Sequence, residues 1–209
     1  MLPDPHTLAV FMAATLALNF TPGPDMMYVI ANSLGHGRRA GVVSALGIGG
    51  GSIVHTAAAA LGLSAILMSS ALAYDAVRYA GAAYLIYLGW KSFTGPGGTV
   101  HATGLSGGSL WRIFRQGVAT NVLNPKVALF FLAFIPQFVD PARGSVVLQF
   151  LLLGTMFNCS GTIVNTAVAL AAGSLGHRFS SKAGVSRARR WFTGTVFVAL
   201  GARIATASR

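Results

Sequence analysis

Apolar residues run through most of this chain in long stretches with few polar positions inside them. Six stretches approach or exceed the ~20 residues that an apolar helix needs to span a bilayer. They cover about residues 7–33, 41–69, 74–93, 113–139, 146–176 and 190–207. Because little polar sequence lies outside them, the pattern predicts an all-α membrane protein, with six transmembrane helices in a single transmembrane domain over residues 1–209.

Composition favours a membrane protein over a soluble one. Of the 209 residues, 54% are hydrophobic and 9% are charged, against about 25% charged in soluble domains. Fifteen basic and four acidic residues are too few to cover the surface of a soluble protein of this length. The single cysteine, Cys159, excludes an intramolecular disulfide and a thiolate metal cluster. No cofactor and no bound metal are expected.

Basic residues concentrate in alternate connections between the apolar stretches. Ten belong on one side of the membrane: Arg38, Arg39, Lys91, Arg112, Arg115, Arg178, Lys182, Arg187, Arg189 and Arg190. Four belong on the other side, with most of the aspartates: Arg78, Arg143, Arg203 and Arg209. Cytoplasmic loops are enriched in Lys and Arg, so we expect the odd connections in the cytoplasm and both termini outside. This distribution explains the net charge of +11 without nucleic-acid binding.

The longest connection, at 92–111, is rich in glycine, serine and threonine and is typical of a flexible linker. It divides the chain into two three-helix halves, about 7–93 and 113–207. A unit with an odd number of crossings enters the membrane upside down when it is repeated. The pattern therefore predicts two inverted three-helix repeats, which are typical of transporters.

Short motifs in the two halves support this repeat. Thr21-Pro22 matches Asn124-Pro125 at an offset of 103 residues. The run Leu88-Gly-Trp-Lys91 resembles Leu200-Gly-Ala-Arg203 at an offset of 112 residues.

The first apolar stretch contains the run Asn19-Phe-Thr-Pro-Gly-Pro-Asp25. Two prolines and a glycine break a spanning helix, and lipid tolerates the freed backbone groups only where they meet protein, water or a ligand. Pro24 suits the first turn of a resuming helix, whose N–H groups would bind an anion such as a carboxylate. Candidate substrate-binding residues here are Asn19, Thr21, Pro22, Gly23, Pro24 and Asp25. The alternative is a proline kink closed by neighbouring helices.

The fourth stretch contains a counterpart, Asn121-Val-Leu-Asn-Pro-Lys126. Candidate substrate-binding residues here are Asn121, Asn124, Pro125 and Lys126. Lys126 is a basic residue well inside an apolar stretch, and ionisable groups at that depth are usually functional. Counting residues along the helices places Asp25 and Lys126 at similar depths, so the two could meet. The alternative for Lys126 is snorkelling of its ammonium to the headgroups.

His55 and Asn158 lie at similar depths in the second and fifth stretches, again 103 residues apart. Asp25 and His55 are the candidates for proton coupling, because either side chain could bind and release a proton. A lone helical histidine is more often a packing residue, and Asn158 is a secondary site candidate. Glycines of these two stretches are expected to permit close helix contacts and would permit a homodimer. They are Gly41, Gly47, Gly49, Gly50, Gly51, Gly62, Gly154 and Gly161.

The runs NFTPGPDMMYVIANSLGHGRRAG, GAAYLIYLGWK and NVLNPKVALFFLAFIPQFVDP together resemble the LysE/RhtB family of bacterial amino acid exporters, above all its homoserine/threonine efflux branch. The resemblance spans nearly the whole chain. It implies an inner-membrane carrier with periplasmic termini that exports small amino acids and is coupled to the proton-motive force. Relatives of this branch often have asparagine where this chain has Asp25, which leaves open whether the acid titrates.

Two other function classes are alternatives to amino acid export. A membrane-embedded enzyme would need a catalytic set such as Ser/His/Asp, HExxH or paired carboxylates, and the apolar stretches contain none of these. A divalent-metal exporter of related architecture would need several converging oxygen or imidazole ligands, and Asp25, His55 and Asn158 are few for that purpose. Which amino acid is carried cannot be read from unaligned residues, because one methylene changes binding by only ~1–3 kcal/mol.

Overall fold

The computed structural model describes residues 4–65 and 109–175, together with single helical positions between 72 and 90 and between 195 and 202. All regular structure in this part of the chain is helical. Apart from these single positions, several expected features lie outside the described residues. They are the stretches at 74–93 and 190–207, most of the linker at 92–111, and the motifs beginning at Leu88 and Leu200.

The first helix, α1 (Pro5–Phe20), begins at a capped end and stops at the expected break. The Asp4 side chain accepts hydrogen bonds from the backbone N–H and the hydroxyl of Thr7, at 2.9 and 2.7 Å. These bonds hold the pKa of Asp4 below its ordinary value. The helix ends at Thr21, which has an extended backbone, and α2 (Pro24–Ala58) begins after Gly23 with Pro24 in its first turn. The predicted proline break is therefore confirmed.

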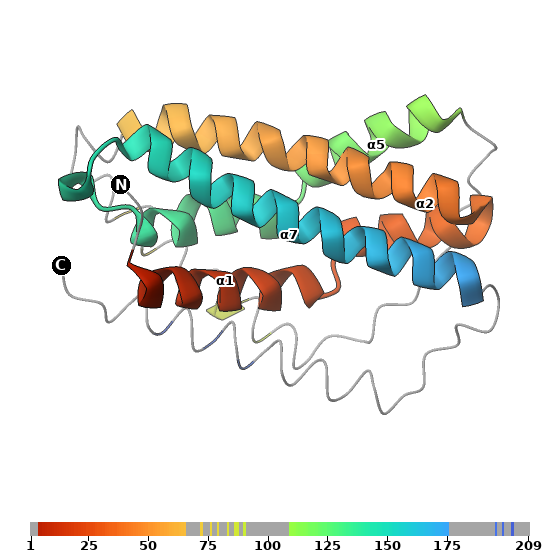
Figure 1. The fold of residues 1–209 in the computed structure, drawn as a ribbon, viewed down its shortest axis with the longest axis horizontal. Coiled ribbons are helices and arrows are strands. Elements are labelled where there is room, and N and C mark those ends of the chain that lie inside the picture. Colours follow the sequence, from red (N-terminus) through yellow and green to blue (C-terminus); the bar gives the residue numbers. More distant parts are fainter. Residues whose placement is uncertain are drawn as a thin grey trace.

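Helix α2 contains a reversal of the chain at Gly37. This glycine has φ of 84°, in the left-handed region that other residues avoid. A Cβ on Gly41 would lie 2.6 Å from the Ser33 hydroxyl oxygen, a proximity that a straight helix does not allow for residues eight apart. Figure 1 shows the chain turning back here. The segment Pro24–Leu63, which ends in the π-helical turn η1 (Ala59–Leu63), therefore includes the end of the first expected stretch and most of the second.

A second broken helix follows the undescribed region. Helix α5 (Leu110–Val122) is followed by α6 (Pro125–Leu129), and α6 continues through η2 (Phe130–Phe134) and η3 (Ile135–Phe138). The axes on the two sides of this break differ by 46°. A short turn, η4 (Pro141–Arg143), leads into α7 (Val146–Leu175). By length and composition, Pro24–Leu63 and Val146–Ser174 could each cross a membrane, and the bent pair would be a third span.

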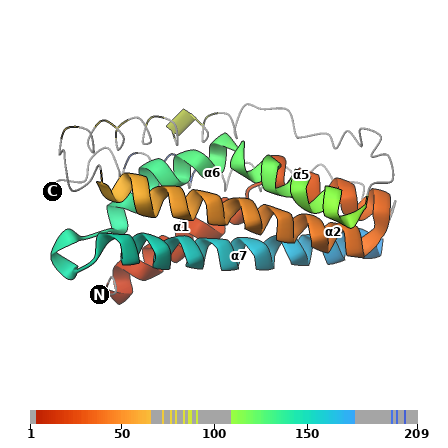
Figure 2. The ribbon, with the colours of Figure 1, turned by 90° about the horizontal axis from the view of Figure 1, so that it is seen from above.

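Helix α2 packs between α5 and α7, as Figure 2 shows. Glycines bring these helices close together: a Cβ on Gly117 would lie 3.1 Å from the Cα of Gly47, and a Cβ on Gly154 would lie 2.6 Å from the Thr56 hydroxyl oxygen. The expected role of the glycines in close packing holds for most of them. It fails at Gly62, where a Cβ would meet nothing described within 4 Å.

Charged side chains separate toward the two ends of the bundle. Arg143 forms ion pairs with Asp4 at 3.9 Å and with Asp140 at 3.2 Å. The turn at Gly37, the start of α5 and the end of α7 lie together at the opposite end (Figure 1). Arginines of the first expected group flank that end, namely Arg38, Arg39, Arg112 and Arg115.

Candidate functional site

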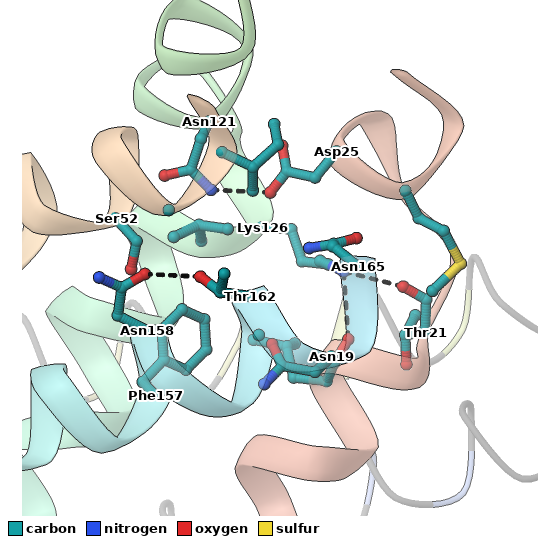
Figure 3. A pocket seen from close by; sticks show the side chains of 16 residues that line it. Asn19, Thr21, Asp25, Ser52, Asn121, Lys126, Phe157, Asn158, Thr162 and Asn165 are labelled. Atoms are coloured by element: carbon teal, nitrogen blue, oxygen red, sulfur yellow. Dashed lines mark hydrogen bonds between the residues drawn. The ribbon is translucent and has the colours of Figure 1, made fainter. Parts of the chain in front are cut away.

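The two helix breaks meet inside the bundle, and Lys126 connects them. Its ammonium donates hydrogen bonds to the backbone carbonyls of Leu18 and Thr21, at 3.2 and 2.9 Å. These carbonyls belong to the last turn of α1 and to the residue that follows it, where a helix carries partial negative charge. The Leu18 carbonyl also accepts the backbone N–H of Thr21, at 3.0 Å. Lys126 therefore points into the protein (Figure 3), which is contrary to the snorkelling alternative.

Gly23 leaves the space that the ammonium occupies. A Cβ at this position would lie 3.2 Å from the Nζ atom of Lys126 and 3.4 Å from its Cε atom. On the other side of the contact, the Asn124 side chain caps α6 by accepting a hydrogen bond from the Lys126 backbone N–H at 3.0 Å. Each break thus helps to hold Lys126 in place.

Asp25 lies in the first turn of α2 and contacts the other broken helix. Its Oδ2 atom accepts a hydrogen bond of 2.8 Å from the Asn121 amide, and the residue is 6% exposed. A carboxylate in this turn already complements the positive end of α2. The Oδ1 atom of Asp25 is buried and has no hydrogen-bond partner among the described residues. It therefore keeps a free acceptor for a donor that enters the site.

Asp25 and Lys126, which lie at depths where they could meet, form no direct pair in this conformation. Within the described residues, Asp25 makes no ion pair within 4.0 Å, and Lys126 uses its ammonium on backbone carbonyls instead. The two residues nevertheless lie near each other, because both line the same cavity.

A cavity of about 30 Å³ lies at this contact. It is lined by Leu18, Asn19, Thr21, Asp25, Met26, Ile48, Gly49, Ser52, Asn121, Lys126, Val127, Phe157, Asn158, Gly161, Thr162 and Asn165. Six of the predicted residues are among these, and Figure 3 shows them together: Asn19, Thr21, Asp25, Asn121, Lys126 and Asn158. The other candidates at the two breaks shape the backbone there and do not line the cavity: Pro22, Gly23, Pro24, Asn124 and Pro125.

His55 lies next to the cavity but does not line it. Its Nε2 atom is 3.1 Å from the backbone carbonyl oxygen of Asn121, and its ring stacks on Phe131 with 5.6 Å between ring centroids. The carbonyl of Asn121 and the amide that binds Asp25 belong to the same residue, so His55 is linked to Asp25 through Asn121.

Three polar cavity residues were not predicted from the sequence: Ser52 on α2, and Thr162 and Asn165 on α7. A signal for the last two does exist. Asn158, Thr162 and Asn165 recur at i, i+4 and i+7, so they form a polar stripe on one face of an apolar helix.

The site is rich in amides and poor in metal ligands. In residues 4–65 and 109–175, no three His, Cys, Asp or Glu side chains gather closely enough to hold a metal ion. The polar side chains that line the cavity carry one carboxylate and one ammonium, together with several amides and hydroxyls. Such a set suits hydrogen bonds to a small organic zwitterion better than coordination of a hard cation.

Comparisons with known proteins identify the family of this chain. A family profile described as LysE type translocator matches residues 16–208. The chain is 30% identical to a homoserine/homoserine lactone efflux protein of Salmonella typhimurium, over 95% of each chain. It is 26% identical to a leucine efflux protein of the same organism, over 94% of this chain and 93% of the relative. It is also 30% identical to an uncharacterized membrane protein of Vibrio cholerae, over 98% of each.

No solved structure is similar to the chain at a significant level. The profile match extends from the last turns of α1 almost to the C-terminus, and it includes both helix breaks. With apolar helices and relatives that are efflux proteins and membrane proteins, the chain belongs to the LysE family of translocators.

Proposed function

We propose that this protein exports small neutral or polar amino acids, such as threonine or homoserine, from the cytoplasm by antiport with protons. The observation that carries the proposal is the meeting of Lys126 and Asp25 in one cavity at the contact of two helix breaks. Ionisable groups are costly inside a membrane, and they persist where they serve a substrate or ion. The chemistry supports a carrier and not an enzyme.

A zwitterionic amino acid fits the two charges in a defined way. The substrate ammonium binds at the free Oδ1 atom of Asp25. The substrate carboxylate binds near Lys126, whose ammonium has three donors and uses two of them on the carbonyls of Leu18 and Thr21. This arrangement reverses the expectation that the start of α2 binds the carboxylate, because Asp25 already supplies the negative charge there.

Transport requires that the cavity open. A volume of about 30 Å³ holds about two water molecules, so this conformation does not accommodate a whole amino acid. The broken helices supply the movable parts, as they do in carriers built from inverted repeats. The two breaks at Thr21–Gly23 and Leu123–Asn124, about 103 residues apart, support such a repeat in this single domain.

Asp25 is the proposed proton-binding group, with His55 as the second candidate. An Asp25→Asn variant cannot bind a proton at this position but keeps a hydrogen-bonding side chain. We therefore expect the variant to exchange threonine across a membrane, with weaker binding, but to lose accumulation driven by a pH gradient. The His55→Ala variant should lose less of this gradient-driven accumulation than Asp25→Asn does. Full gradient-driven accumulation by Asp25→Asn would contradict the coupling role.

The direct test of function is substrate counterflow in proteoliposomes that contain the purified protein. Vesicles loaded with unlabelled threonine or homoserine should take up external labelled threonine, and empty vesicles should not. Vesicles loaded with manganese provide the control for the alternative of a metal exporter, which the amide-rich site does not favour. Manganese flux without any amino acid flux would contradict the proposal.

We place the carrier in the bacterial inner membrane with both termini in the periplasm and the 92–111 linker in the cytoplasm. The separation of Arg143, Asp4 and Asp140 from the basic end at Arg38 supports this orientation. Its partners are then the amino acid, protons and surrounding lipid.

A further inference from the structure

One side of the cavity is polar although the helix that forms it is apolar. Asn158, Thr162 and Asn165 face the cavity from α7, and Ser52 faces it from α2 (Figure 3). Helix α7 is long and apolar enough to cross a membrane. Polar side chains on such a helix, turned toward a cavity, indicate contacts with something that occupies it.

Much of the hydrogen-bonding capacity of these groups is unused. The hydroxyl oxygen of Ser52 is buried without a partner among the described residues, and Ser52 is 3% exposed. Asn165 is 9% exposed and makes no hydrogen bond to the described part of the chain. Asn158 accepts one long bond of 3.3 Å from the Thr162 hydroxyl. A buried polar group without a partner is unfavourable, and a bound polar group would supply the missing hydrogen bond.

Close packing keeps this polar side of the cavity narrow. A Cβ on Gly49 would lie 2.8 Å from the Thr162 hydroxyl oxygen and 3.3 Å from Asn158 Oδ1, so α2 approaches α7 closely here. Ile48 and Phe157 line the cavity as apolar neighbours of these polar groups. The space therefore suits a short substrate side chain that carries a hydroxyl.

We propose that Ser52, Asn158 and Asn165 bind a side-chain hydroxyl of the substrate and so determine specificity for hydroxyl-bearing amino acids over aliphatic ones of the same size. This inference rests on the proposed function and adds the residues that choose among its substrates. A site that hydrogen-bonds a substrate hydroxyl discriminates strongly against an analogue without it, because the polar groups of the site then stay unpaired. An apolar pocket cannot do this.

Threonine and valine provide the test, because they differ by a hydroxyl in place of a methyl group. In counterflow, the wild-type protein should transport threonine at least about tenfold faster than valine at the same low concentration. Asn165→Leu replaces the amide by an apolar group of similar size, and we expect the threonine-to-valine ratio to fall at least about tenfold. Ser52→Ala is a smaller change that a helix tolerates readily, and it should lower the ratio several-fold.

The matched control is Thr155→Val, which removes a hydroxyl from the exposed face of the same helix, where it bonds the Leu151 carbonyl. The threonine-to-valine transport ratio of this variant should equal that of the wild type. Equal transport of valine and threonine by the wild type, or an unchanged ratio in both Ser52→Ala and a folded Asn165→Leu, would overturn the specificity assignment alone. Absence of flux for every amino acid would instead refute the proposed function, and this inference with it.

Discussion

Lys126 occupies a position where backbone chemistry favours a cation. The C-terminal end of α1 carries partial negative charge, and the ammonium of Lys126 donates to two backbone carbonyls there, those of Leu18 and Thr21. A charge-assisted hydrogen bond contributes roughly 1.5–3 kcal/mol, so this contact joins the two broken helices firmly. A substrate carboxylate that attracts Lys126 would weaken the same contact, which links binding to movement of the helices.

A substitution at Gly23 tests this position without removing any charge. Its extended backbone, with φ of −157°, suits alanine as well as glycine, particularly before a proline. The added methyl would lie 3.2 Å from Nζ of Lys126 and displace it. We expect Gly23→Ala to unfold at the same temperature as the wild type in detergent but to show threonine counterflow reduced several-fold.

Gly35→Ala is the control for this change, since a Cβ at Gly35 meets nothing described within 4 Å. Its counterflow should match that of the wild type. Normal counterflow by Gly23→Ala would show that the position of the Lys126 ammonium does not matter for transport.

The sequence predicted both breaks, because proline cannot continue a hydrogen-bonded helix wherever the chain goes afterwards. It also predicted that Asp25, Asn121 and Lys126 belong to one site. The partners of Lys126 were not predictable, because they are backbone carbonyls of Leu18 and Thr21, and no residue pattern marks a carbonyl. The sequence instead suggested that Lys126 could meet Asp25, since side-chain charges are what a sequence displays.

At the scale of the helices, close packing of α2 against α5 positions the site. A Cβ on Gly51 would lie 2.6 Å from the Cβ of Asn121 and 2.8 Å from the carbonyl oxygen of Val118. Asn121 is also the residue that binds Asp25. The spacing between these two helices therefore sets the distance between the two breaks.

Gly51→Ala should consequently push α5 away from α2. Forcing extra atoms into a packed contact costs typically about 1–3 kcal/mol, so we expect a lower unfolding temperature in detergent together with loss of counterflow. Gly62→Ala serves as the comparison because the space around Gly62 is open among the described residues. If Gly51→Ala were as stable as Gly62→Ala, the two helices would not be in the contact described.

Other helix features follow from tertiary contacts that a sequence does not display. The end of the first expected stretch and most of the second, at 41–69, both belong to α2. Only Gly37, whose positive φ reverses the chain, separates them. The polar stripe that includes Asn165 has a helical period and could have been recognised. Ser52 lies among glycines and apolar residues, and only the packing of α2 against α7 shows that it faces a cavity.

The proposed orientation of the whole chain in the membrane rests on the distribution of its charges. Cysteine labelling tests it in a background where Cys159 is replaced by alanine. In intact cells, an impermeant thiol reagent should modify Ser145→Cys, which lies in the connection before α7 near Asp140 and Arg143. It should not modify Ser106→Cys in the expected cytoplasmic linker until the cells are opened. The opposite result would invert the topology and place the termini in the cytoplasm.

The cavity between the two helix breaks is the proposed binding site of the transported amino acid. The most direct measurement is protection of a cysteine in that cavity from alkylation, in the Thr162→Cys, Cys159→Ala variant. Threonine should slow alkylation at this position at least about tenfold if it occupies the site at a concentration well above its Kd. In the wild-type protein, the exposed native Cys159 lies outside the cavity on the same helix, and threonine should leave its alkylation unchanged. Active threonine counterflow by the Thr162→Cys, Cys159→Ala variant without any protection would contradict the claim, because the substrate would then bind elsewhere.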